Sequence, residues 1–239
     1  MRNKLLTILG SLLLAISSYT ASNAQSFNIG VTGALATLNA SGTESNSGAT
    51  NAGTEASVRN ASVENQGIPI GSVFVEFESD YWGLTLGFEH VPMTADVSDN
   101  VKTRNDTETS VTGTATQTTN ARVFKANAEV ENFNKLYLEL PIANNFFVRA
   151  GIAELDVNTT EVKSGNGGSY GNATLDGTVL GLGIKGDVGD SMGYKLFYEQ
   201  TDLDQLKLTS TGNSTGSGTN SITADLDVTE LKFALSYKF

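Results

Sequence analysis

The nine residues from Leu231 to Phe239 read LKFALSYKF and alternate strictly between two kinds of side chain. Every second residue, starting with Leu231, is large and apolar, while the residues between them are small or positively charged. Such alternation is typical of a β-strand, because successive side chains point to opposite faces of a sheet. Chain ends are usually frayed and polar. An end this apolar indicates a strand that is paired and faces an apolar environment.

The same alternation recurs in seven further stretches, near residues 27–35, 71–78, 82–89, 135–140, 146–153, 178–185 and 194–199. Three of the connections are short, at 79–81, 141–145 and 186–193. Four are long and rich in Ser, Thr, Asn and Gly, at 39–68, 91–129, 156–174 and 203–224. Segments of this composition bury too little apolar surface to fold alone. We expect hydrated loops there, with the strands extending a few residues into them.

One face of these strands carries most of the charge. Its ionisable residues are Glu76, Glu78, Glu89, Lys135, Glu139, Arg149, Lys185, Lys195, Glu199, Glu230 and Lys232. The other face has almost nothing ionisable in its central part. An apolar outside around a polar inside is the pattern of outer-membrane barrels. Hydrocarbon offers no hydrogen bonds, so the first and last strands must pair.

The sequence therefore predicts an all-β fold, an eight-stranded antiparallel up-and-down transmembrane β-barrel with short periplasmic turns and four long extracellular loops. Phe239 would lie at the periplasmic lipid boundary. The aromatic girdle expected at that boundary consists of Phe27, Trp82, Phe146, Tyr194, Tyr237 and Phe239.

The first 24 residues have the layout of a signal peptide. Arg2 and Lys4 precede an apolar run from Leu5 to Ile16, which is too short to span a bilayer, and small residues follow up to Ala24. We expect cleavage after Ala24, which leaves residues 25–239 as one barrel domain. Localisation in the bacterial outer membrane follows from this export signal and from the strand pattern.

The charge balance excludes some partners. Without Arg2 and Lys4, 13 basic residues remain against 26 acidic ones, a net charge of −13. A chain this acidic is a poor electrostatic partner for nucleic acid or for anionic headgroups. The chain has no Cys, so no disulfide supports it.

The ordered set of features resembles the small eight-stranded outer-membrane barrels built like the OmpA transmembrane domain and OmpX. The stretches FFVRAGIAELDV and SYGNATLDGTVLGLGIKG are also similar to porin-like outer-membrane barrel proteins. The resemblance implies insertion by the barrel assembly machinery, with Tyr237 and Phe239 as the C-terminal assembly signal. The expected barrel accounts for residues 25–239, so the resemblance does not extend to the periplasmic peptidoglycan-binding domain of full-length OmpA, and a cell-wall tether is not implied.

Two interpretations of the inward charges remain open. An eight-stranded barrel has an interior just wide enough for side chains, so the charges can form a salt-bridged plug. Alternatively, they form a gate whose ion pairs exchange partners and let small ions pass. Removing one member of a buried pair leaves the other charge unpaired, which costs about 3–5 kcal/mol.

Other candidate sites are weaker. His90 is the single His, and the sequence places it at the interfacial rim on the lipid-facing side, with Glu89 pointing the other way. Asp202 and Asp204 flank the last long connection together with Asp225 and Asp227; they read as solvated loop charges, with divalent bridging to lipopolysaccharide as the alternative. We expect no catalytic residue, no cofactor and no bound metal.

The function indicated is a non-enzymatic outer-membrane barrel with a structural or surface-interaction role, in envelope integrity, adhesion or phage contact through acidic polar loops. The expected partners are outer-membrane lipid and lipopolysaccharide, the assembly machinery and an extracellular ligand of the loops. One alternative is a small gated porin that passes ions or small solutes. Two others are a soluble lipocalin-like binder, with its apolar faces inside, and a lipid-modifying enzyme.

Overall fold

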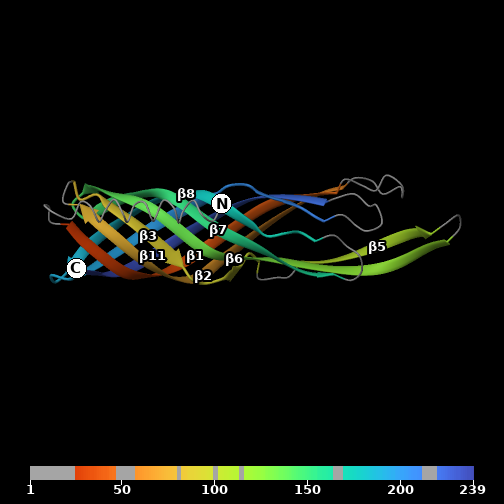
Figure 1. Ribbon diagram of the computed structural model, residues 1–239, viewed down its shortest axis with the longest axis horizontal. Coiled ribbons are helices and arrows are strands. Elements are labelled where there is room, and N and C mark those ends of the chain that lie inside the picture. The colour runs from red at the N-terminus through yellow and green to blue at the C-terminus, as the bar shows by residue number, and fades with distance from the viewer. Residues whose placement is uncertain are drawn as a thin grey trace.

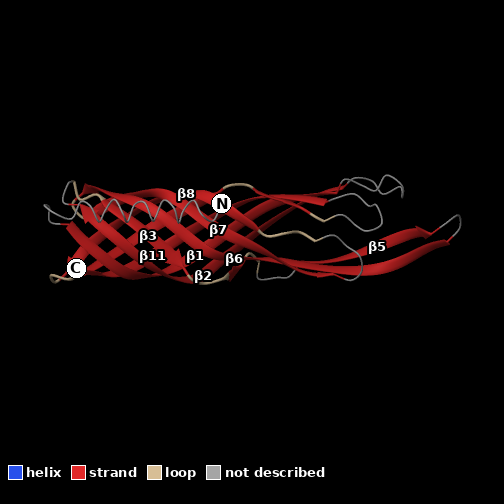
Figure 2. Cartoon of the chain, viewed as in Figure 1, coloured by secondary structure: helices blue, strands red, loops and turns tan. Residues whose placement is uncertain are grey.

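The computed structural model describes residues 25–46, 57–79, 82–98, 102–112, 116–163, 169–211 and 220–239. All regular structure in these ranges is β-strand (Figure 1, Figure 2). None of it is a helix long and apolar enough to cross a membrane. The expected signal peptide, residues 1–24, lies outside the described residues.

Eight strands form a closed antiparallel ring. In ring order they are β1 (Gln25–Asn46), β2 (Ser57–Ser79), β3 (Thr85–Val91), β6 (Thr116–Ala143), β7 (Phe146–Lys163), β8 (Ala173–Val188), β9 (Met192–Leu203) and β11 (Asn220–Lys238). The ring closes where β11 pairs with β1, from Asn28 opposite Lys238 to Asn46 opposite Asn220. The stretch LKFALSYKF therefore lies in the closing seam, and the predicted eight-stranded antiparallel barrel is confirmed.

Short turns join β2 to β3, β6 to β7 and β8 to β9, and they lie with Phe239 at one end of the barrel (Figure 1). We call this the turn end and the opposite end the hairpin end. The predicted turn positions were off by a few residues. β3 begins at Thr85 rather than Trp82, because Trp82 and Gly83 adopt left-handed φ angles of 62° and 63° in the turn itself. β6 continues through Pro141 to Ala143.

The long connections are mostly strand in their described parts, so the prediction of loops at 39–68, 91–129, 156–174 and 203–224 was wrong there. β1 and β2 stay paired as far as Asn46 opposite Ser57. β5 (Lys102–Thr112) pairs with β6, as does β4 (Ala95–Asp96), and β10 (Leu206–Thr209) pairs with β11. The polar composition is compatible with strand pairing, because the hydrogen bonds of a ladder join backbone N–H and C=O groups and do not depend on the side chains. Thr, which is frequent here, also favours strands. The extensions form two arms at the hairpin end, one with β1 and β2 and one with β5 and β6 (Figure 1).

The two faces of the strands exchange character along the barrel. On β9, outward Leu196 is 44% exposed and lies near inward Glu199, which is fully buried. Farther along the same strand, outward Asp202 is exposed and inward Leu203 is buried. A reversal of this kind is expected where the surroundings change from hydrocarbon to water. The apolar outward faces of the turn-end half form what we call the apolar belt.

The interior of the hairpin-end half is consequently apolar. Its buried residues, the inner apolar cluster, are Ala36, Leu38, Val91, Phe133, Ala153, Leu155, Val157, Leu175, Val179, Leu203, Leu206, Leu208, Leu226 and Val228. The predicted polar interior is thus correct for the turn-end half and wrong for the hairpin-end half. The error arose because the predicted strands ended near the edge of the apolar belt, before the faces exchange.

Candidate functional site: a buried ion network

Most of the inward charges meet inside the turn-end half of the barrel. We call this set the ion network, and it consists of Glu76, Glu89, Lys135, Glu139, Arg149, Lys195, Glu199, Glu230 and Lys232. None of these residues is more than 7% exposed. Their side chains come from six of the eight strands and are linked through shared partners.

Arg149 contacts three carboxylates of the network. Its Nη2 lies 2.6 Å from Glu139 Oε1, and its Nη1 lies 2.9 Å from Glu199 Oε2 and 3.3 Å from Glu89 Oε2. The guanidinium also stacks on the Tyr137 ring, 3.7 Å from its centroid. A planar guanidinium provides several fixed donors at once, which a lysine ammonium cannot do in the same geometry.

Two lysines extend the network toward β11. Lys135 Nζ lies 2.6 Å from Glu199 Oε1 and also pairs with Glu230. Lys232 Nζ lies 2.7 Å from Glu89 Oε1 and 3.0 Å from Glu199 Oε1. Glu199 therefore has cations on both of its oxygens, and the charges of four strands are connected through it.

The third lysine holds the other side of the network. Lys195 Nζ lies 2.7 Å from Glu139 Oε2 and also pairs with Glu76. Tyr137 donates its hydroxyl to Glu76 Oε1 at 2.8 Å. Ser72 donates to Glu89 Oε1 at 2.6 Å. These hydroxyls were not among the predicted site residues, although Tyr137 shares the inward face with Lys135 and Glu139.

The register of the ladders explains how the network forms. Glu89 lies directly opposite Lys135 on the β3–β6 ladder, and Glu139 lies opposite Arg149 on the β6–β7 ladder. Directly opposed side chains of opposite charge stabilise a strand pair. The alternation in the sequence therefore placed these charges on one face, and the antiparallel register brought them to one level.

The remaining predicted charges, Glu78 and Lys185, lie apart from the network. They form their own pair, with Lys185 Nζ 3.3 Å from Glu78 Oε1, and both side chains are partly exposed. Glu78 lies opposite Thr85, where β3 begins after the turn. This pair is near the turn end and in contact with solvent, so it is electrostatically weaker than the ion network.

The structure places His90 at the edge of the apolar belt. Its Nδ1 lies 2.8 Å from Asn134 Oδ1, and the ring is partly exposed. Among the described residues, Asn134 is therefore the side-chain hydrogen-bond partner of His90. The neighbouring Glu89 points into the ion network, as predicted from the alternation.

The candidate carboxylates of the last long connection meet only in part. Asp202 lies opposite Asp227 on the β9–β11 ladder. Neutral donors contact both of them: Gln200 donates to Asp202 at 2.9 Å and Asn39 donates to Asp227 at 2.8 Å. Across the part of the chain that is described, no group of three or more His, Cys, Asp or Glu side chains could hold a metal ion.

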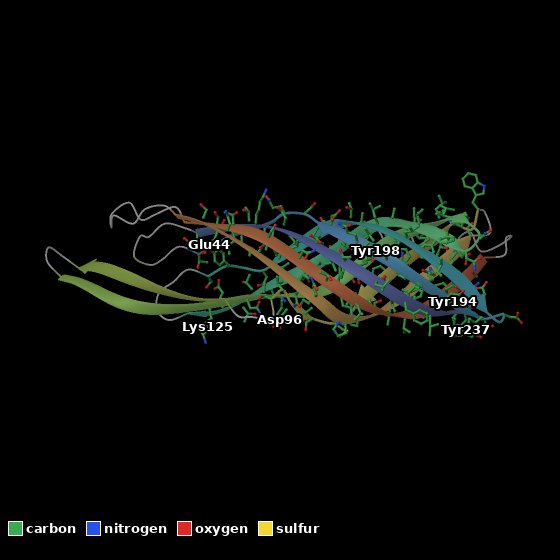
Figure 3. All side chains as sticks on the ribbon, turned by 180° about the vertical axis from the view of Figure 1, so that it is seen from behind. Glu44, Asp96, Lys125, Tyr194, Tyr198 and Tyr237 are labelled. Carbon is green, nitrogen blue, oxygen red and sulfur yellow. The ribbon has the colours of Figure 1, made fainter. Side chains whose placement is uncertain are left out.

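The predicted girdle residues lie around the turn end. Phe239 packs against Phe27 with ring centroids 6.2 Å apart and against Tyr237 at 4.9 Å. Its backbone N–H donates to the Phe27 carbonyl at 2.9 Å. Tyr194 and Tyr237 lie close to this end, and Tyr198 lies farther along the barrel (Figure 3).

No family model matches the chain, and no curated protein matches it in sequence. Solved outer-membrane barrels are similar in fold. The attachment invasion locus protein Ail of Yersinia pestis is 10% identical, with a TM-score of 0.43 over 91% of this chain and 100% of that one. The outer membrane protein OprG from Pseudomonas aeruginosa is 15% identical, with a TM-score of 0.41 over 92% and 98%.

The outer membrane protease OmpT from Escherichia coli is 10% identical, with a TM-score of 0.43 over 93% of this chain and 100% of that one. These proteins include a protease, so they do not indicate one activity. The closed ring, the apolar belt and the charged interior are features of the chain itself. The fold is a closed barrel of eight antiparallel strands.

Proposed function

We propose that this chain is an integral outer-membrane β-barrel whose lumen is closed by the ion network and whose role is non-enzymatic, at the cell surface. The observation that carries the proposal is the burial of that network. Its nine side chains are paired with one another across the barrel. A hydrated ion would have to break several of these pairs in order to pass.

The surface role follows from the hairpin end. The two arms of extended strand lie beyond the apolar belt (Figure 1), and their sequence is rich in Thr, Ser and Asn, with acidic and basic residues in nearly equal numbers. Such arms suit contact with another cell-surface component, through envelope contacts, adhesion or phage attachment. The proposed partners are outer-membrane lipid and lipopolysaccharide, the assembly machinery, and an extracellular ligand of the arms.

The test is single-channel conductance of the refolded protein in a planar bilayer. Wild type is compared with Arg149→Ala, and Lys185→Ala, which alters a charge outside the ion network, is the control. Silence from wild type supports the closed lumen. Steady openings of the wild type that change in Arg149→Ala but not in Lys185→Ala would establish the gated porin instead.

Membrane location is tested separately. An integral barrel is expected to require detergent for extraction and to migrate differently on a gel before and after boiling. A soluble lipocalin-like protein would be released by salt or osmotic shock. Unchanged lipid profiles on overproduction are expected, and a changed profile would favour the lipid-modifying enzyme.

A further inference from the structure

The barrel wall has a gap in its backbone ladder between β2 and the segment that contains β3 and β4. The β2–β3 pairing extends only to Val73, which lies opposite His90. β2 itself continues beyond this point, paired with β1. Past Val73, the Gly71 N–H donates to Met93 Sδ at 3.1 Å, where a backbone carbonyl would otherwise be the acceptor. At this point a flexible thioether side chain bridges the wall.

Local sequence explains the gap. Pro92 directly follows the last residue of β3; it has no N–H to donate and restricts the residue before it. On the other side, Gly67 is the extra residue of a β-bulge and has a φ of 71°. A bulge bends its strand and interrupts pairing. Farther along, Asn65 Nδ2 donates to the Asp96 carbonyl at 3.1 Å, which again is a side-chain contact.

A pocket lies behind this gap. It has a volume of about 40 Å³ and is partly open to the surroundings. Its mouth is formed by Pro69 and Met93, which are exposed, and by Ile70. Its inner lining belongs to the inner apolar cluster and consists of Ala36, Leu38, Val91, Phe133, Leu155 and Val228. The pocket therefore leads from the outside of the barrel into the apolar part of the lumen.

The mouth is level with the outer edge of the apolar belt. Pro69 lies opposite Leu35 on the β1–β2 ladder, and Leu35 lies opposite Leu231 on the β1–β11 ladder. Leu35 and Leu231 point outward and are 60% and 54% exposed. The polar outward residues begin beyond this row, with Thr37 and Asn39 on the same strand.

We propose that this pocket binds the end of an unbranched alkyl chain, which enters through the gap between Pro69 and Met93. The lining is apolar apart from Thr94 and Glu131, so it excludes ions and favours hydrocarbon. Met93 adapts to such an occupant because its side chain is unbranched and flexible. The chain can come from a membrane lipid or from a free apolar solute, since both offer the same chemistry. The proposal rests on the membrane location proposed above.

The test places a fluorophore inside the pocket. Trp82 is the single tryptophan of the sequence, so Phe133→Trp in a Trp82→Phe background reports from the lining alone. In the same background, Phe147→Trp is the matched control, because Phe147 is equally buried but packs in the turn-end half. Tyr198→Trp, outward and 52% exposed, reports lipid contact. Each protein is reconstituted in vesicles with acyl chains that are either brominated or unbrominated, and 1-bromodecane is added to the unbrominated set.

We expect the fluorescence of the Phe133→Trp protein to be quenched either by brominated lipid or by bromodecane. The fluorescence of the Phe147→Trp protein should fall little with either quencher. Loss with brominated lipid identifies an acyl chain, and saturable loss with bromodecane identifies a free solute. Adding Ala36→Leu, which narrows the pocket, should restore the fluorescence.

Two results would contradict this expectation at different levels. In the first, neither brominated lipid nor bromodecane quenches the Phe133→Trp protein, while brominated lipid does quench the Tyr198→Trp protein. The barrel is then in the membrane and the pocket proposal is wrong. If brominated lipid does not quench the Tyr198→Trp protein, the membrane location itself fails.

If the Phe133→Trp protein does not fold, native mass spectrometry of the wild type tests whether the pocket binds an alkyl chain. The protein is incubated with decanol in detergent and compared with Ala36→Leu. A bound lipid or decanol mass that Ala36→Leu loses supports the pocket. The same bound mass in both proteins, or none in the wild type, overturns it.

Discussion

Asn28 and Glu76 are paired directly across the β1–β2 ladder, and each has one buried oxygen without a hydrogen-bond partner among the described residues. These atoms are Asn28 Oδ1 and Glu76 Oε2, on side chains that belong to residues only 4% and 1% exposed. The ion network contains five carboxylates and four cations, so it carries one excess negative charge. Glu230 Oε1 also lacks a hydrogen bond but lies 3.4 Å from Lys232 Nζ. Glu76 Oε2 has no such cation among the described residues, so Glu76 is the carboxylate whose charge the network compensates least.

The first prediction concerns this excess charge. Glu76→Gln should leave the free energy of unfolding unchanged or raise it, because the amide keeps an acceptor for Lys195 and Tyr137 and offers a donor near Asn28. Glu139→Gln, the matched control, weakens the partner of both Arg149 and Lys195 and should cost about 3–5 kcal/mol. Urea unfolding in detergent, followed by the gel shift of the folded barrel, measures both. An equal loss in the two variants would contradict this account.

The second prediction concerns the shape of the Arg149 side chain. Arg149→Lys preserves the charge but loses the contacts with several carboxylates and the stacking on Tyr137. We expect a loss of about 2–3 kcal/mol, on the scale of one or two charged hydrogen bonds. Lys185→Ala removes a partly exposed ion pair and should cost about 0–1 kcal/mol. Urea unfolding of the two variants beside wild type measures both losses. If Arg149→Lys has the same free energy of unfolding as wild type, the stability of the network depends on net charge and not on the geometry of the guanidinium.

The sequence predicted the ring and the inward set of charges because both depend on a period of two residues, which survives in every strand. It did not predict the apolar hairpin-end interior. The reason is visible on β11, where outward Leu231 and inward Glu230 are followed toward the hairpin end by outward Asp225 and inward Leu226. The two-residue alternation continues along the strand, but the outward residues change from apolar to polar. In the sequence, such a polar stretch of strand cannot be distinguished by composition from a loop.

The contacts within the network were also beyond sequence reasoning. Alternation shows that Arg149 points inward. Which carboxylates it contacts, namely Glu139, Glu199 and Glu89, depends on the register of the strands and on the barrel diameter. Glu78 and Lys185 share that face and still lie outside the network, because they are near the turns. Position along the barrel axis, which the period alone does not provide, separates the two groups.

The third prediction concerns the position at which the faces exchange. Leu196 and Gln200 both point outward from β9, four residues apart and on opposite sides of the proposed membrane boundary. Leu196→Lys should cost about 2–4 kcal/mol and Gln200→Lys about 0–1 kcal/mol, because the penalty for a charge depends on depth in the bilayer. Unfolding in lipid vesicles measures both. Equal penalties would mean that the boundary does not lie between these residues.

The fourth prediction concerns the space that the Tyr137 ring occupies. A Cβ on Gly87 would overlap the Tyr137 ring, whereas a Cβ on Gly33 has no atom within 4 Å. Gly87→Ala should therefore displace the ring from Glu76 and Arg149 and cost about 1–3 kcal/mol, the usual range for overpacking. Gly33→Ala points outward and should change stability by less than about 0.5 kcal/mol. The midpoint of urea unfolding compares the two variants. Comparable effects of the two substitutions on stability would show that the Tyr137 ring can move aside without destabilising the barrel.

The fifth prediction separates assembly from stability at the seam. Phe239→Ser keeps the backbone hydrogen bond to Phe27 and loses two ring contacts, so the refolded protein should lose only about 1–2 kcal/mol. If Phe239 is part of an assembly signal, the amount of this variant in the outer membrane of growing cells should fall far more than that loss explains. Phe27→Ser is the control, because it removes one of the same ring contacts from the other strand of the seam. Equal amounts of the two variants in the membrane would assign Phe239 a packing role alone.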